Sequence, residues 1–513
     1  MITKLYGSAV YGIEATTIMV EVNTAPGVGY HLVGLPDNAI KESNYRIAAA
    51  LQNNGYSIPG KKITLNMAPA DLRKEGSAYD LTLAIGILIS TGQIRPVYGP
   101  ERYLIMGELS LDGGLLPIKG ALPIAIQAKE EGFEGFILPA QNAAEAVVVE
   151  GLKVYGVSHI SEVIGHFARG EELTPSNKED LEKELRKVPD AVPDFSEVRG
   201  QEAVKRGLEI AAAGGHNVLL IGPPGSGKTM LAKRLAGILP PMSLSEALET
   251  TKIHSVAGRT KDNPGLMTSR PFRSPHHTIS DVALVGGGGY PQPGEISLAH
   301  NGVLFLDELP EFKRSVLEVM RQPLEDREVT ISRARFTVTY PASFMLVASM
   351  NPSPGGYFAD SDAPITNTPV EIQRYMNRLS GPLLDRIDLH IEVFPVAFEE
   401  LAKERDGERS DVIRARVSSA RERQTERFME QSTVHYNAQM DVSAIRDHCR
   451  LDAVSSRILK EAMERLKLSA RAYDRILKVA RTIADLAGEQ RISTAHLAEA
   501  IQYRSLDRKI RNE

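Results

Sequence analysis

The sequence of 513 residues contains a single cysteine, Cys449, so no disulfide can form within the chain. Such sparing use of cysteine is usual in a reducing compartment. We expect Cys449 to serve as a small buried apolar side chain and not as a nucleophile. A disulfide-stapled fold is therefore excluded, and the composition is typical of a cytoplasmic protein.

Long apolar runs are also missing. No stretch of about 20 apolar residues occurs, which predicts that no helix spans a membrane. The first residues, MITKLYGSAVYGIEATTI, lack the apolar core of a signal peptide. The formal net charge of −5 gives the whole molecule no basic signature for nucleic acid. A local basic surface would still suffice, because only the contacting face must be positive.

The length and the hydrophobic content indicate several domains, each able to bury an apolar core. The length predicts about three domains, and 42% of the residues are hydrophobic. Residues 1–169 alternate strand-like and helix-like runs, which predicts an α/β or α+β domain. Residues 170–195 are charged and predict a linker with one exposed helical piece. We place a second α/β domain at 196–396 and an all-α domain at 397–513, where glycine and proline become rare.

Periodicity locates individual elements of the first domain. The stretches TTIMVEVNT (16–24) and KKITLNM (61–67) predict strands. Residues 38–55 and 79–92 predict helices, each closed by Asn or Gly before a break.

The stretch GPPGSGKT, residues 222–229, lies between the apolar strand pattern HNVLLI (216–221) and a helix pattern. Strand, glycine loop and helix are the context that a phosphate-binding loop requires. We expect backbone N–H groups and the helix N-terminus to bind the phosphates of ATP. Lys228 would reach the β- and γ-phosphates, and Thr229 would bind Mg²⁺. The nucleotide-binding residues are Gly222, Pro223, Pro224, Gly225, Ser226, Gly227, Lys228 and Thr229.

Two further strand patterns end in polar residues. GVLFLDELPEF (302–312) ends its apolar run in Asp307 and Glu308, which suit Mg²⁺ coordination and activation of the attacking water. SFMLVASMN (343–351) ends in Asn351, whose amide could orient that water or instead cap the following turn.

Three arginines are candidates for the remaining contacts to phosphate. Arg386 lies ahead of another strand and could act in trans as an arginine finger, or could pair with Asp385 or Asp388. In the helix pattern at 466–488, Arg471 or Arg475 could reach the phosphates from the lid domain. A solvated helix face is the alternative for both.

Together these motifs resemble the AAA+ ATPases, with Arg471 at the sensor 2 position. Residues 270–312 and 379–393 resemble more specifically the Mg-chelatase-like ATPases of the ComM/YifB type. The similarity extends over essentially the whole chain, including GLPDNAIKESNYRI (34–47). This resemblance implies an AAA+ P-loop core with a parallel sheet, an all-α lid, a homo-hexameric ring and hydrolysis of ATP with Mg²⁺. For the ComM type it also implies branch migration of DNA during natural transformation.

The N-terminal domain resembles the Lon-type protease fold through residues 107–139. Its EGSAYDL motif (75–81) places Ser77 where Lon-type enzymes carry their nucleophile. Leu122 stands where those enzymes have a lysine. Lys119 lies in a turn three residues away, whereas a Ser–Lys dyad needs its amine within about 3 Å of the hydroxyl. We therefore expect a non-catalytic domain used for binding or assembly.

The family pattern commonly includes four cysteines, spaced like a zinc site, after the Asn351 position. This chain has Ser353, Gly355, Ile365 and Asn367 there, so no structural zinc is expected. His276 and His277 could also suggest a metal site. Adjacent side chains diverge, however, so a hydrogen-bonding or nucleic-acid-facing loop is favoured.

Two segments could act on a substrate. LVGGGGYPQPGEI (284–296) is too rich in glycine and proline for a helix interior and resembles the helix-2 insert of this clade. REVTISRARFTVTYP (327–341) alternates with period two about SRAR, which predicts a β-hairpin. In the clade this hairpin projects into the ring pore. Arg333 and Arg335 at its tip would then present positive charge to a phosphate backbone, unless the tip is merely solvated.

The favoured hypothesis is a ring-forming ATPase that moves on single-stranded or branched DNA. The first alternative is an ATPase that remodels a protein partner, as in the metal-chelatase and MoxR relatives. An ATP-dependent protease is a weaker alternative, because Leu122 replaces the lysine that the reaction needs.

Overall fold

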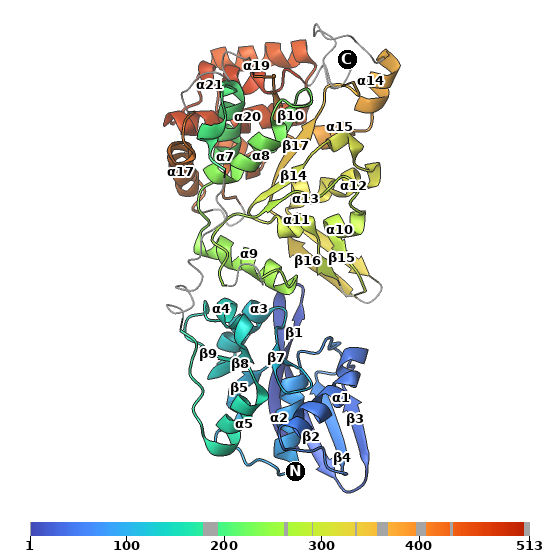
Figure 1. Cartoon of the computed structure of the whole chain (residues 1–513). Coiled ribbons are helices and arrows are strands. Elements are labelled where there is room, and N and C mark those ends of the chain that lie inside the picture. The colour runs from blue at the N-terminus through green and yellow to red at the C-terminus, as the bar shows by residue number, and fades with distance from the viewer. Residues whose placement is uncertain are drawn as a thin grey trace. The chain divides into compact units, whose positions relative to one another are not determined.

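The computed structural model describes residues 2–177, 193–260, 265–289, 291–333, 336–355, 368–396, 407–430 and 434–506. These residues form two compact units. The first joins Met1–Val188 to Ser243–Thr268, and the second joins Pro189–Met242 to Ser269–Glu513. Both are seen in Figure 1. The predicted domain boundaries at 169, 196 and 397 stay a prediction. Residues 243–268 were expected inside the ATPase core, but they pack with the first unit.

A seven-stranded sheet forms the centre of the first unit, in the order β3-β4-β2-β1-β5-β8-β9. The strands β1, β2 and β4 are antiparallel neighbours, and the other pairs are parallel. The bounds are β1 (Ile2–Tyr11), β2 (Glu14–Ala25), β3 (Gly29–Val33), β4 (Lys62–Ala68), β5 (Tyr103–Ile105), β8 (Gly135–Pro139) and β9 (Lys153–Val157). A separate short ribbon pairs β6 (Glu108–Leu109) with β7 (Leu115–Leu116). The strands predicted at 16–24 and 61–67 are confirmed.

Helices α1 (Asn38–Asn53) and α2 (Asp80–Ser90) confirm the two predicted helices of this unit. Asp37 caps α1 by accepting from the Ile40 N–H at 2.9 Å. All 11 residues of α2 are buried, which explains its continuous apolar sequence. The remaining helices are α3 (Ala121–Glu130), α4 (Ala143–Ala146), α5 (Ile160–Arg169) and the 3₁₀ turns η1 (Pro100–Arg102) and η2 (Ala140–Asn142).

Helix α9 (Leu244–Val256) follows the phosphate-loop helix in sequence but packs against α3 in the first unit. The Gly120 N–H donates to the Ser255 carbonyl at 3.1 Å. Beneath this contact lies Glu145, which accepts from the Ala121 N–H at 3.1 Å and from the Ser255 hydroxyl at 3.4 Å. Burial raises the pKa of Glu145 to about 7. Hydrogen bonds and a shared core thus join α9 to this unit.

The second unit contains a five-stranded sheet in the order β11-β14-β17-β10-β18, with every pair parallel. Its strands are β10 (Val218–Ile221), β11 (Phe272–Arg273), β14 (Val303–Leu306), β17 (Met345–Met350) and β18 (Leu389–Glu392). The three central strands β14, β17 and β10 are buried throughout, as apolar strands covered on both faces must be. The parallel sheet predicted for this part of the chain is confirmed.

Helices and short turns make up most of the other described elements of this unit up to residue 396. They are η3 (Phe195–Glu197), α7 (Glu202–Gly214), α8 (Lys228–Ile238), α10 (Asp281–Val285), α11 (Glu295–Leu298), η4 (Leu309–Glu311), α12 (Arg314–Val319), α13 (Arg321–Asp326), α14 (Pro369–Met376) and α15 (Gly381–Leu384). The glycine-rich stretch folds into two-residue strands, β12 (Gly286–Gly287) and β13 (Gln292–Pro293). The described residues of this stretch form no long helix, as expected.

The hairpin predicted from SRAR is present. Strand β15 (Glu328–Arg333) pairs antiparallel with β16 (Phe336–Pro341) from Glu328 opposite Pro341 to Arg333 opposite Phe336. Tyr340 of β16 is buried, and its hydroxyl donates to the Pro291 carbonyl at 2.8 Å. The hairpin is therefore fastened to the glycine-rich segment.

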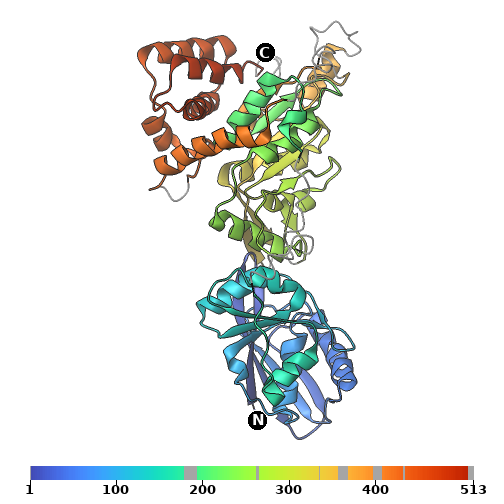
Figure 2. The same ribbon diagram turned by 60° about the vertical axis from the view of Figure 1, so that its left-hand side comes forward.

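After residue 407 the described chain is helical, as predicted. The helices are α17 (Ser410–Arg427), η5 (Asn437–Gln439), α18 (Val442–His448), α19 (Ala453–Leu466), α20 (Ala470–Ala487) and α21 (Thr494–Gln502). Figure 2 shows them in orange and red as one bundle beside the sheet of the second unit. Cys449 is buried among them, and burial raises the pKa of its thiol to about 12. It is a core residue, as expected. None of the helices in the described ranges is long and apolar enough to cross a bilayer.

Candidate nucleotide site

The glycine loop joins β10 to α8 at the carboxyl edge of the parallel sheet. The Gly222 N–H donates to the Met350 carbonyl at 3.2 Å, and a Cβ at Gly222 would overlap the Val393 carbonyl oxygen. Gly225 and Gly227 have φ angles of 76° and 89°, which L side chains rarely adopt. No side chain caps the first turn of α8, which leaves its first N–H groups available to an anion. Pro223, Pro224 and the buried Ser226 complete the loop.

Lys228 is folded over this loop. Its Nζ donates to the Gly222 carbonyl at 2.7 Å, the Pro223 carbonyl at 2.9 Å and Oδ1 of Asn351 at 3.2 Å. Burial lowers the pKa of Lys228, opposed by the nearby carboxylates Asp307 and Glu308. The structure thus brings the lysine and the asparagine, 123 residues apart, to one point.

Thr229 and Asp307 supply adjacent oxygen atoms. The Thr229 hydroxyl donates to Oδ2 of Asp307 at 2.7 Å, and the Ser349 hydroxyl donates to Oδ1 of the same carboxylate. In the described parts of the chain no three His, Cys, Asp or Glu side chains form a metal cluster. A hydroxyl and one carboxylate nevertheless fit Mg²⁺, which takes few protein ligands and completes its shell with water and phosphate oxygens.

Glu308, the second residue after β14, has a left-handed backbone, φ 54°. Its N–H donates to Ser349 Oγ and to Asp307 Oδ1, both at 3.2 Å. The side chain is 57% exposed, and its Oε2 lies 3.8 Å from Nδ1 of His277. The carboxylate is therefore accessible to a water molecule, whereas two hydrogen bonds hold the Glu308 backbone.

Sequence reasoning missed several neighbours of this site. Ser349 could have been noticed as a hydroxyl inside an otherwise apolar strand. From the sequence, His277 was considered only as a metal or loop residue. In the structure its ring lies beside Glu308, and its ring centroid is 4.1 Å from that of His276. Tyr375 donates to the Asn351 carbonyl at 3.3 Å, and burial raises its pKa to about 12. Nothing in its local sequence indicates that position.

The candidate finger Arg386 is only 5% exposed. It forms an ion pair with Glu325 and donates to the Pro382 carbonyl at 2.6 Å. The alternative pairing with Asp388 is not what the structure shows, since Asp388 binds Arg475 at 2.9 Å. Glu325 was not anticipated from the sequence.

The structure distinguishes the two lid candidates, Arg475 and Arg471. Arg475 of α20 is engaged by Asp388, which also faces Nδ1 of His216 at 3.3 Å. Burial alone would raise the pKa of Asp388, but Arg475 and His216 outweigh it and hold the pKa well below its usual range. Arg471, in the first turn of α20, is exposed. Of the two, Arg471 therefore stays the candidate for contact with phosphate.

Three family models match the chain in succession. They are "subunit ChlI of Mg-chelatase" at 20–142, "magnesium chelatase, subunit ChlI" at 194–401 and "magnesium chelatase, subunit ChlI C-terminal" at 407–504. Competence protein ComM of Haemophilus influenzae is 45% identical over 98% of this chain and 97% of its own length. An uncharacterized protein YifB of Escherichia coli is also 45% identical, over 98% and 96%. The chain belongs to the ComM/YifB-type Mg-chelatase-like family.

More distant relatives match parts of this Mg-chelatase-like chain. The magnesium-chelatase 67 kDa subunit of Heliobacterium mobile is 27% identical over 38% of the chain and 30% of its own length. A Lon protease of Salinispora arenicola is 27% identical over 33% of the chain and 23% of its own length.

The surroundings of Ser77 in this family member differ from those of a Ser–Lys dyad. The Ser77 hydroxyl donates to Oε2 of Glu108, and Leu122 is fully buried in the core. Lys119 packs against Gly258. The observed partner of Ser77 is thus a carboxylate and not an amine.

Other predicted positions lie partly outside the described residues. Arg333 ends β15, but its side chain and all of Arg335 are outside them, so their shared direction stays a prediction. Ser353 is buried at 5% exposure, whereas Ile365 and Asn367 are also outside the described ranges.

Replacing Ser349 with alanine should raise the Mg²⁺ concentration needed for half-maximal ATP hydrolysis by roughly 10- to 100-fold, the usual effect of losing a partner of a metal-binding carboxylate. The reason is that Asp307 and the Glu308 N–H both lose the hydroxyl that fixes them. A Mg²⁺ titration of ATPase activity measures the effect. Ser297→Ala is the matched control, because Ser297 is equally buried but its hydroxyl has no partner within the described residues. Equal Mg²⁺ dependence in both variants would contradict the assignment.

Proposed function

We propose that this protein is an ATPase that hydrolyses ATP at the edge of the five-stranded sheet. The observation that carries the proposal is the convergence of Lys228, Thr229, Asp307, Glu308 and Asn351 at one point. Lys228 would bind the β- and γ-phosphates, Thr229 and Asp307 would hold Mg²⁺, and Asn351 would orient the attacking water. Glu308 would accept the proton of that water. Bound Mg²⁺ supplies neutralisation of charge on the phosphates.

We further propose a ring in which Arg386 of one subunit completes the site of the next. Arg386 would have to leave Glu325, whose side chain is 48% exposed and so accessible to a neighbouring chain. Arg471, exposed at the start of α20, would contact the phosphates from the lid of the same subunit.

DNA is the proposed substrate, and movement along DNA is the proposed use of ATP. Similarity over almost the whole length to a relative named as a competence protein supports this proposal. Arg333, at the end of β15, and Arg335, two residues later in the sequence, carry positive charge in a chain whose net charge is negative. A ring of such hairpins would attract a phosphate backbone locally.

Remodelling of a protein partner is the second candidate. Similarity to a magnesium-chelatase subunit favours it. For the N-terminal unit we propose a Lon-like fold without protease activity, because Leu122 replaces the needed amine and Ser77 bonds to Glu108.

The DNA proposal is tested with Arg333→Glu/Arg335→Glu and a single-stranded oligonucleotide, using fluorescence anisotropy over a salt series. We expect affinity to fall steeply at low salt and the salt dependence to flatten, because fewer counterions are released. ATP hydrolysis without DNA should be unchanged, since the hairpin tip supplies none of the groups assigned to ATP.

The matched comparison is Arg457→Glu/Lys460→Glu on the exposed face of α19. This pair should leave DNA affinity intact. If it is this pair that weakens binding, DNA lies on the helical bundle. If neither does, protein remodelling becomes the favoured function.

A further inference from the structure

The base of the hairpin is closed by residues just outside its strands. The Ala342 N–H donates to the Arg327 carbonyl at 2.7 Å, which continues the ladder by one step. Arg327 has a left-handed backbone, φ 58°, between α13 and β15. Ser343 follows immediately on the other side. A group that holds both Arg327 and Ser343 therefore fixes the direction in which the hairpin leaves the core.

Tyr436, from the helical bundle, is such a group. Its hydroxyl accepts from Nη1 of Arg327 at 3.2 Å and lies 3.0 Å from the Ser343 hydroxyl. The guanidinium of Arg421 lies over its ring, 4.2 Å from the centroid, and that of Arg327 lies 5.5 Å away. Cations above the ring and at the hydroxyl hold the side chain from two directions.

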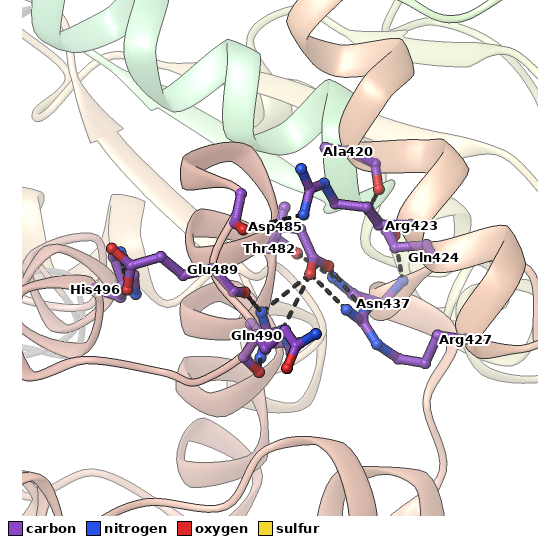
Figure 3. Close-up of polar contacts among 12 residues, drawn as sticks. Ala420, Arg423, Gln424, Arg427, Asn437, Thr482, Asp485, Glu489, Gln490 and His496 are labelled. Atoms are coloured by element: carbon purple, nitrogen blue, oxygen red, sulfur yellow. Dashed lines mark hydrogen bonds and ion pairs between the residues drawn. The ribbon is translucent and has the colours of Figure 1, made fainter.

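The segment that carries Tyr436 is itself fixed in the bundle, as Figure 3 shows for the next residue, Asn437. Asn437 is fully buried. Its N–H donates to Oε1 of Gln424 at 2.8 Å, and its amide donates to Thr482 at 3.1 Å and to Asp485 at 2.8 Å. If the hairpin moved away from the bundle, Tyr436 could move with it only if the bonds of Asn437 to α17 and α20 broke.

Asp485 closes this network with two cations. It accepts from both terminal nitrogens of Arg427, at 2.8 and 2.5 Å, and from Nε of Arg481 at 3.2 Å. Arg481 is only 2% exposed and also donates to the Gln490 carbonyl at 2.7 Å. Charge-assisted bonds of this kind make the bundle around Asn437 a rigid support.

Tyr436 also lies against the approach to the phosphate loop. Gly215 ends α7 with φ 69°, and a Cβ there would overlap the Tyr436 ring. The next residue, His216, is buried and bonds to Thr482 of α20 at 2.7 Å. One side chain thus contacts the hairpin base, the helical bundle and the turn that leads into β10.

We propose that Tyr436 is a positioning residue that couples the helical lid to the hairpin, so that a nucleotide-dependent change in the lid alters the hairpin. This inference rests on the proposed ATPase function but not on DNA being the substrate. Its hydroxyl carries the coupling, because it is the Tyr436 atom that bonds to both Arg327 and Ser343. The ring by itself keeps the contacts with Gly215 and Arg421.

The test uses the full chain with Thr339→Trp as a reporter on β16. The sequence contains no tryptophan, and Thr339 is exposed. Tryptophan anisotropy and quenching are measured with and without a non-hydrolysable ATP analogue. In the parent, the tryptophan anisotropy and quenching should change when the analogue binds. In Tyr436→Phe this change should be roughly tenfold smaller, the effect of losing a hydrogen bond to a charged donor. The kcat and KM for ATP without DNA should not change.

Tyr340→Phe is the control, because it removes the buried hydroxyl that fastens the hairpin to the Pro291 carbonyl. It should keep the response. Ser343→Ala removes one side of the junction and should weaken the response less than Tyr436→Phe does. It decides the matter if the tyrosine variant does not fold.

A full response in both Tyr436→Phe and Ser343→Ala would overturn the proposal. So would a parent that binds the analogue without any change in the reporter. A parent that responds to the analogue but does not bind DNA would refute the DNA substrate alone, because the reporter assay contains no DNA.

Discussion

Glu308→Gln is expected to bind ATP with nearly unchanged affinity and to lose about 10²- to 10⁴-fold in turnover, the range that a general base contributes. The amide keeps the size of the side chain but cannot accept the proton of the attacking water. Binding should survive, because the Glu308 N–H still donates to Ser349 and Asp307, and Lys228 and Thr229 are untouched. Single-turnover hydrolysis and equilibrium binding of ATP separate the two effects.

Glu311→Gln is the matched control. Glu311 lies three residues further on, is similarly exposed at 45% and pairs with Arg378. It should hydrolyse ATP at close to the normal rate. Lys228→Ala should give the opposite pattern to Glu308→Gln, with weakened nucleotide binding. Hydrolysis by Glu308→Gln at the wild-type rate would show that another group activates the water.

Asp485→Ala is expected to destabilise the second unit by about 3–5 kcal/mol, the usual loss when one partner is removed from a buried ion pair. Two guanidiniums would remain without their shared carboxylate, since Arg481 is 2% exposed and the Arg427 side chain 15%. Asn437 would also lose an acceptor. Urea unfolding of the full chain, followed by circular dichroism, measures the loss as a lower midpoint for one transition.

The control for this variant is Glu461→Ala on the exposed face of α19. An exposed carboxylate contributes little, so its midpoint should stay where the parent has it. If Asp485→Ala unfolds at the same urea concentration as this control, the network in Figure 3 does not stabilise the bundle.

The sequence was most informative where chemistry and periodicity are local. The glycine loop, the strands that end before Asp307 and Asn351, and the SRAR hairpin each depend on a short run of residues, and their elements are confirmed. The convergence of Lys228 and Asn351 could also be expected, because neighbouring parallel strands end at one edge of a sheet.

Other features depend on residues far apart in the chain. The local sequence offered two arginines on one helix and could not show that Asp388 engages Arg475. The pairing of Arg386 with Glu325 requires two segments to meet that share no motif. His277 was judged by its neighbour His276, whereas its contact with Glu308 arises only in the folded sheet.

Helix α9 gives the chain an interlaced topology. The polypeptide leaves the second unit after Met242, completes the first unit through α9 and returns at Ser269, so the two units share three covalent connections with the linker included. A fragment that ends before residue 243 would lack a helix that packs on α3 and bonds to Glu145. Because each unit is built from two stretches of the chain, a single break in the coding sequence cannot divide the protein into its two units. Helix α8 ends at Ile238 and α9 begins at Leu244, so only a few residues of backbone lie between a helix of the second unit and one of the first.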